Sequence, residues 1–105
     1  MQVIFRTDNH IEGHDRLATY ASEVVTHVLG RFDEHVTRVE VHLSESGSKD
    51  AAERTRCVME AHVGGRPPVA VSHLAEDEGT SLDGGAKKLR RALDTVFGKM
   101  NDHHA

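Results

Sequence analysis

Residues 36–43 read VTRVEVHL. Apolar and polar side chains alternate along this stretch, with Val39, Val41 and Leu43 in one set and Arg38, Glu40 and His42 in the other. Because successive side chains of a β-strand point to opposite faces of the sheet, this period of two predicts a strand with one buried and one solvated face. The segment before it has a different period, and that change decides the fold.

The preceding segment has helical spacing. From Asp15 to Phe32 the apolar residues recur at steps of three and four, which are Leu17, Tyr20, Ala21, Val24, Val25, Val28, Leu29 and Phe32. Residues 1–7 alternate, with Val3 and Phe5 expected on the inner face, and they predict a first strand that ends at the turn residues Asp8 and Asn9. A strand, a crossover helix and a second strand favour a parallel, right-handed pairing.

Two more strands are expected after residue 43. Residues 45–53 lack periodicity and indicate an exposed loop, whereas residues 55–63 alternate and place Cys57, Met59, Ala61 and Val63 in the core. Pro67 and Pro68 cannot donate ladder hydrogen bonds, so the fourth strand is expected at residues 69–75. The pattern leaves open which face of this strand is buried, that of Val69, Val71 and His73 or that of Ala70, Ser72 and Leu74.

A second helix is predicted near the C-terminus. Asp77 suits the N-cap of a helix that begins near Glu78 or Gly79. Its apolar stripe consists of Leu82, Ala86, Leu89, Leu93, Val96, Phe97 and Met100. Gly84 and Gly85 each cost roughly 1 kcal/mol relative to alanine inside a helix, so the start of this helix is expected to fray.

The predicted order is therefore β-α-β-β-β-α. The chain is assigned to the α+β class, with a four-stranded mixed sheet and two helices packed on one face. Its 105 residues suit a single domain over residues 1–105, and only four aromatic residues are present, so the core is expected to be aliphatic.

The composition excludes several classes of protein. The longest stretch without a charged residue is residues 67–75, far short of the ~20 apolar residues of a membrane span. No signal-peptide pattern is found, and a cytoplasmic location with no membrane partner is expected. Cys57 is the single cysteine, which excludes an internal disulfide and a multi-cysteine zinc site; it is interpreted as a buried strand residue.

Charge is distributed unevenly along the chain. The net charge is −4, but residues 80–105 hold five cations against three aspartates and are positive by two. At about 100° per residue, four of these cations lie away from the leucine stripe of the second helix and one lies at its border; the four are Lys87, Lys88, Arg91 and Lys99, and the fifth is Arg90. Such a face suits phosphates, although a solvated helix surface that binds nothing has the same pattern.

Histidines and hydroxyl residues indicate no reaction centre. Nine histidines are present, but no HExxH motif, no Cys/His pair at zinc-finger spacing and no clustered carboxylates accompany them. His42 and His62 are expected as neighbours on the outer sheet face, and His103 and His104 could bind a transition metal adventitiously. No nucleophile elbow and no phosphate-cradling glycine motif is found. We therefore predict no enzyme, no catalytic residue, no metal site, no cofactor and no small-molecule substrate.

Three stretches resemble the ribosome hibernation promoting factor and ribosome-associated inhibitor family. They are Phe32-Asp33-x-His35-Val36-Thr37-Arg38-Val39-x-Val41-x-Leu43, the strand end Ala61-His62-Val63-x-Gly65, and Asp77-x4-Leu82-Asp83-x-Gly85-x2-Lys88-Leu89-x-Arg91-x-Leu93. The resemblance covers nearly the whole chain, includes the order of the elements, and corresponds to the short class of the family. It implies a topology like that of double-stranded-RNA-binding domains.

The resemblance also implies a function. Family members bind the small ribosomal subunit where tRNA and mRNA would sit, and so silence idle bacterial ribosomes in stress or stationary phase. Lys88 and Arg91 match basic positions of the family, and Lys87 and Arg90 extend that face. We include Lys99 and Arg16 among the expected RNA-binding residues, although the first helix here keeps only Arg16 and Arg31 as fixed cations where relatives carry several.

Two other interpretations remain open at the level of sequence. A diverged module of the same fold could bind a protein through the exposed sheet face, which would present Arg38, Glu40, His42, Arg56, Glu60 and His62. A small enzyme or metal-binding protein is the third alternative. The sequence leaves open whether unpaired sheet edges support weak homo-oligomers.

Overall fold

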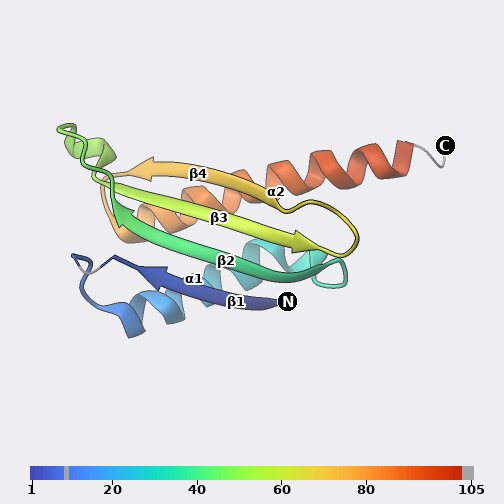
Figure 1. Ribbon diagram of the computed structural model, residues 1–105, viewed down its shortest axis with the longest axis horizontal. Helices are drawn as coiled ribbons and strands as arrows, with labels where there is room; N and C mark the ends of the chain where they lie inside the picture. Colours follow the sequence, from blue (N-terminus) through green and yellow to red (C-terminus); the bar gives the residue numbers. More distant parts are fainter. Residues whose placement is uncertain (9, 103–105) are drawn as a thin grey trace.

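The computed structural model describes residues 1–8 and 10–102, with side chains described up to Gly98. Its main elements occur in the predicted order, which is β1 (Gln2–Thr7), α1 (His14–Leu29), β2 (Val36–Glu45), β3 (Thr55–Val63), β4 (Val69–Ala75) and α2 (Glu78–Asp102) (Figure 1). Two short 3₁₀ turns lie at Gly30–Phe32 and Ala51–Glu53. The predicted β-α-β-β-β-α order is confirmed.

The four strands form one mixed sheet in the order β1-β2-β3-β4. β1 is parallel to β2, and the other neighbours are antiparallel. Val71 and His73 of β4 pair with Met59 and Cys57 of β3, whose side chains are buried, so the face that carries Val69, Val71 and His73 turns inward. This register decides the question that the pattern of residues 69–75 left open.

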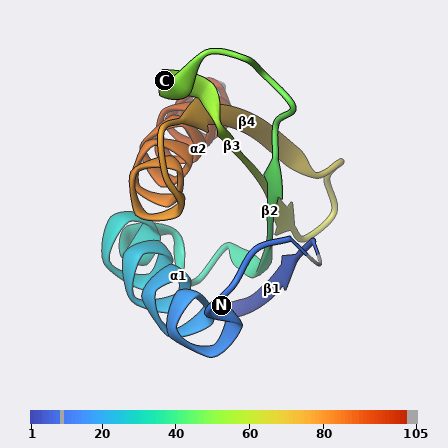
Figure 2. The ribbon, with the colours of Figure 1, turned by 90° about the vertical axis from the view of Figure 1, so that its left-hand side faces the viewer.

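Both helices cover the same face of the sheet (Figure 2). The core between the layers is aliphatic, as predicted. Its fully buried side chains include Val39, Val41, Leu43, Cys57 and Met59 from the sheet and Leu29, Leu82, Leu89 and Leu93 from the helices. Among the described residues, no helix has the length and apolar character that a bilayer crossing requires.

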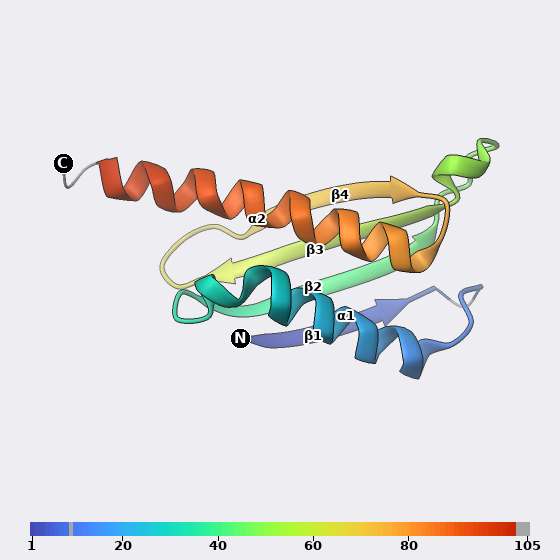
Figure 3. The same cartoon turned by 180° about the vertical axis from the view of Figure 1, so that it is seen from behind.

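The two helices lie side by side and run in the same direction (Figure 3). Near their N-terminal ends the Tyr20 hydroxyl donates a hydrogen bond of 2.7 Å to Asp83 Oδ1. Further along, Arg31 forms an ion pair with Asp94. Because Tyr20 and Arg31 are as far apart in sequence as Asp83 and Asp94, these two pairs hold α1 and the 3₁₀ turn after it in a parallel register with α2.

The first helix is shorter than predicted. α1 ends at Leu29, and the chain tightens into a 3₁₀ turn at Gly30–Phe32. This turn still buries Phe32, whose ring stacks on Phe97 of α2 with centroids 5.5 Å apart. Helical spacing alone could not distinguish an α-helical last turn from a 3₁₀ turn, because both bring residues three apart to one face.

The N-terminus of α2 is capped as predicted. The Thr80 backbone N–H donates to Asp77 Oδ1 over 2.7 Å. This hydrogen bond to the backbone of Thr80 lowers the pKa of the Asp77 carboxyl. The expectation of a frayed start is wrong, because the helix is regular from Glu78 and already buries Ser81 and Leu82 in its first turns.

Candidate nucleic-acid interface

Four cations lie on the outer surface of α2. Leu82, Ala86, Leu89 and Leu93 form a stripe that is buried against the sheet, and the opposite side of the helix faces solvent. The exposed cations of this stretch are Lys87, Lys88, Arg90 and Arg91. We call these four residues the α2 basic face.

The members of the α2 basic face differ in their partners. Lys88 Nζ donates a hydrogen bond of 2.8 Å to the Ser72 carbonyl oxygen, so its ammonium group lies over the edge strand β4. Within the part of the chain that the structure describes, Lys87, Arg90 and Arg91 form no ion pair. Three cations are therefore available to an anionic partner, and the fourth marks the boundary of the face.

Two acidic residues of the same region contact α1 or the 3₁₀ turn that follows it. Asp83 accepts the hydrogen bond from Tyr20, and Asp94 pairs with Arg31. The hydrogen bond to Asp83 is the main cause of a raised pKa of the Tyr20 hydroxyl. Because Asp94 is paired with Arg31, it offsets less of the positive charge of α2 than the sequence count suggests, whereas Asp83 bonds to a neutral hydroxyl and keeps its charge.

Arg16 is separate from the α2 basic face. It is exposed in the first turns of α1 and borders a hollow together with Tyr20, Asp77, Glu78 and Gly79. Gly79 lies eight residues before Lys87, which corresponds to roughly 12 Å along the helix axis. The structure therefore does not bring Arg16 into the cluster, and the side chain of Lys99 lies outside the described residues.

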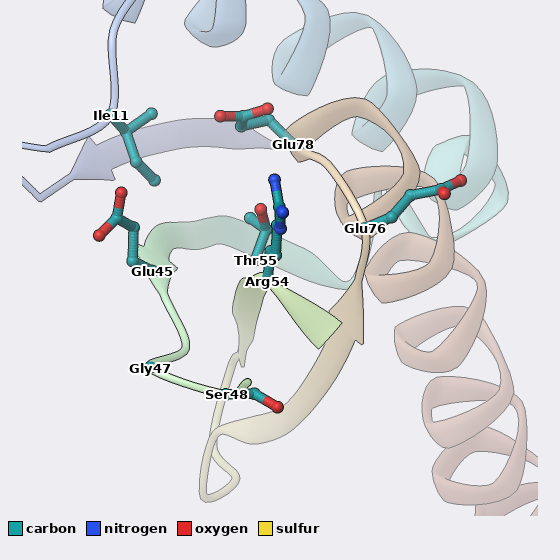
Figure 4. Close-up of a pocket in the computed structure, with 8 residues that line it drawn as sticks. All are labelled: Ile11, Glu45, Gly47, Ser48, Arg54, Thr55, Glu76 and Glu78. Carbon is teal, nitrogen blue, oxygen red and sulfur yellow. The ribbon is translucent and has the colours of Figure 1, made fainter. Parts of the chain in front are cut away.

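One hollow among the described residues is acidic. It has a volume of about 520 Å³ and is lined by Ile11, Glu45, Gly47, Ser48, Arg54, Thr55, Glu76 and Glu78. Figure 4 shows the Arg54 side chain extending into the hollow among these residues. Three glutamates against one arginine disfavour a phosphate ligand here, because like charges repel.

The open face of the sheet carries charges that pair with one another. Glu40 lies 3.4 Å from Arg38 and 3.5 Å from Arg6. His42 Nε2 lies 3.0 Å from Asp8 Oδ1. The expected neighbourhood of His42 and His62 is wrong, because His42 lies opposite Val58, whereas His62 lies opposite Arg38, four residues before His42 on β2.

His62 has carboxylates as neighbours instead. Its Nε2 atom lies 2.7 Å from Glu40 Oε2 and 2.7 Å from Glu60 Oε1. The prediction that no clustered carboxylate accompanies a histidine is therefore wrong. The sequence predicted that Glu40, Glu60 and His62 lie on the outer face of the sheet. It did not predict the register that places Glu40 opposite Glu60, because the loop of residues 45–53 between the two strands has no pattern that fixes it.

Cys57 is fully buried on β3. Burial raises the pKa of its thiol to about 12. Since the thiolate is the reactive form of cysteine, this side chain is inert as a nucleophile in the folded protein. The interpretation of Cys57 as a core residue is confirmed.

Comparisons with solved structures identify the same architecture. The N-terminal domain of Protein Y from Thermus thermophilus has a TM-score of 0.73 and 17% sequence identity, over 91% of this chain and 99% of that chain. A ribosomal subunit interface protein from Coxiella burnetii has a TM-score of 0.66 and 10% identity, over 93% of this chain and 99% of that one. At these identities the likeness establishes the fold.

A search of curated proteins finds no match to this chain. A family match is found, in contrast, over residues 4–101, and the family is described as "Sigma 54 modulation protein / S30EA ribosomal protein". This match includes β2, β3 and the α2 basic face, which carry the motifs noted in the sequence. The protein therefore belongs to the sigma 54 modulation and S30EA ribosomal protein family.

Proposed function

We propose that this protein binds the small ribosomal subunit through its rRNA, occupies the tRNA and mRNA channel, and silences idle ribosomes in stress or stationary phase. The observation that carries the proposal is the α2 basic face, in a chain that belongs to a ribosome-associated family. The proposal assigns the protein to the cytoplasm of a bacterium, treats residues 1–105 as one domain, and requires no catalytic step and no cofactor.

The α2 basic face is suited to phosphate contacts. Arginine and lysine side chains bind the phosphate oxygens of nucleic acid, and their binding releases condensed counterions. Lys87, Arg90 and Arg91 make no ion pair with described residues, so their contact with rRNA would break no such bond. Lys88 would exchange its hydrogen bond with the Ser72 carbonyl for a phosphate contact.

Occlusion is the mechanism that fits this arrangement. Double-stranded RNA and its junctions are recognised mostly by shape and by backbone contacts, which a rigid helix face can supply. α2 is anchored to the sheet by Leu82, Leu89 and Leu93, and it is held laterally by Tyr20 of α1 and by Arg31 of the 3₁₀ turn that follows α1. A rigid domain bound in the decoding channel would exclude tRNA and mRNA by its volume.

Co-sedimentation tests the proposal directly. The full chain is mixed with purified small or large ribosomal subunits at low salt, and tRNA with mRNA is then added as a competitor. We expect the chain to pellet with small subunits, not with large ones, and to be displaced by the competitor. Failure to pellet with small subunits at any salt concentration would overturn the proposal and favour a protein partner on the open sheet face.

A further inference from the structure

Three potential metal ligands converge on the open face of the sheet, which lies opposite the helices. Glu40 of β2 pairs directly with Glu60 of β3, and His62 follows Glu60 by two residues on the same face. Like charges directly opposite each other destabilise an antiparallel pair. This position of the sheet therefore favours a cation between the two carboxylates.

The histidine is aimed at both carboxylates. His62 Nε2 lies 2.7 Å from an oxygen of Glu40 and 2.7 Å from an oxygen of Glu60. The Nε2 atom is shielded from solvent, yet it forms no hydrogen bond with either oxygen. A buried polar atom without a hydrogen bond is costly and calls for a partner.

We propose that Glu40, Glu60 and His62 form a Zn²⁺ site on the open face of the sheet. One nitrogen and two oxygen ligand atoms lie within 4.8 Å of one another. Imidazole and carboxylate are ordinary zinc ligands, with metal–ligand distances of about 2.0–2.2 Å. In a tetrahedral site such ligands lie about 3.3–3.5 Å apart, so the 2.7 Å contacts need to widen by less than about 1 Å.

The remaining coordination position faces solvent. The side chains of Glu40 and Glu60 are 28% and 40% exposed, so an ion can enter without disturbing the core. With three protein ligands, the fourth position of a tetrahedral ion would be taken by water. The ion would also replace the repulsion between the two glutamates by attraction.

Two arginines compete with the ion for one ligand. Arg38 Nε lies 3.4 Å from Glu40 Oε2, and Arg6 lies 3.5 Å from Glu40 Oε1. Exposed ion pairs of this length add little stability, so they oppose metal binding only weakly.

This proposal is independent of ribosome binding, because the site lies on the face of the sheet away from α2. It is tested by titrating the chelator-treated full chain with ZnCl₂. The terminal His103 and His104 are replaced by alanine in every sample, so that they do not bind the ion. Calorimetry gives the stoichiometry and affinity, and ¹⁵N NMR follows the imidazole nitrogens.

We expect one Zn²⁺ per chain and a shift of the Nε2 resonance of His62, with no such shift on addition of MgCl₂, because Mg²⁺ prefers oxygen ligands. His62→Gln and Glu60→Gln should each weaken binding by about tenfold or more. His42→Gln is the matched control, since His42 lies on the same face but pairs with Asp8, and its affinity should equal that of the parent.

Two results would overturn the proposal. One is the absence of zinc binding once the terminal histidines are removed, and the other is equal zinc affinity in the parent and in His62→Gln. If the glutamine variants fail to fold, the NMR titration of the parent chain still decides, because an unchanged His62 resonance at saturating zinc excludes this residue as a ligand.

Discussion

Gly84 of α2 packs against the imidazole ring of His73 on β4. A Cβ atom at Gly84 would lie 2.1 Å from His73 Nε2 and 2.2 Å from Cδ2, well inside van der Waals contact. The neighbouring Gly85 has a similar role, because a Cβ there would lie 3.0 Å from Cys57 Sγ. The two glycines that disfavour a helix thus allow α2 to approach the sheet closely.

Replacement of Gly84 by alanine should therefore destabilise the protein. The gain in helix propensity is about 1 kcal/mol, and the overpacking against His73 costs roughly 1–3 kcal/mol. In a His73→Ala background the clash is absent, and the same substitution should be neutral or stabilising. Urea denaturation of the four proteins in this cycle measures the coupling. Equal effects of Gly84→Ala in both backgrounds would show that the ring does not restrict this position.

Protonation of His73 should destabilise the fold. Burial, and then the positive charge of Lys88, lower the pKa of this imidazole. The pKa of His73 is about 6.5 in the unfolded chain and lower in the folded protein, so the unfolded chain binds more protons between these two pKa values. The contribution of His73 to stability is therefore complete above the unfolded-state pKa and is lost as the pH falls from that pKa toward the folded-state pKa.

The pH dependence of unfolding checks this sign. The free energy of unfolding of the parent and of His73→Gln is compared from about pH 7.5 down to about pH 5.5. As the pH falls, the free energy of unfolding of the parent should decrease more than that of His73→Gln. The substitution Lys88→Gln should make this additional decrease smaller. A difference that stays constant over this range would contradict the burial and charge effects on His73.

The Cys57 thiol should resist modification in the native state. Burial raises its pKa to about 12, so almost no thiolate is present at about pH 8, and no path from solvent reaches the sulfur. Reaction with a disulfide reagent should occur only after denaturant is added. Rapid stoichiometric modification of the folded chain would mean that β3 is more accessible than its burial indicates.

Periodicity predicted the elements of this fold well, because each strand or helix buries one face. β3 and β4 have the predicted bounds, and the inner residues of β3 are those expected. The pairing of strands and the packing of helices on the sheet were harder to predict from the sequence. The buried face of β4 and the glycine contacts of α2 depend on how β4 pairs with β3 and how α2 packs on both, and none of this is encoded in the pattern of a single segment.

The candidate interface shows the same limit. Helical periodicity placed Lys87, Lys88 and Arg91 away from the leucine stripe, with Arg90 at its border, and all four are exposed in the structure. The pairing of Asp94 with Arg31 joins residues 63 positions apart, so no local pattern reveals it. The cluster of His62 with two glutamates was missed for a related reason, since it depends on the register of β2 against β3.

The α2 basic face is tested most directly by charge reversal with a matched control. In one variant Lys87, Lys88, Arg90 and Arg91 are replaced by glutamate. In the control variant four other exposed cations are replaced by glutamate, so that both variants have the same net charge; these are Lys49, Arg54, Arg56 and Arg66. Circular dichroism and urea denaturation confirm that both variants remain folded.

Affinity for purified small ribosomal subunits is then measured over a salt series for the parent and both variants. We predict salt-dependent binding of the parent and the control, and loss of binding in the α2 variant. In single substitutions, the slope of log affinity against log salt should fall by roughly 0.7–0.9 for each phosphate contact removed. Equal affinities and slopes for the α2 variant and the control would contradict the assignment of this helix face as the rRNA-binding surface.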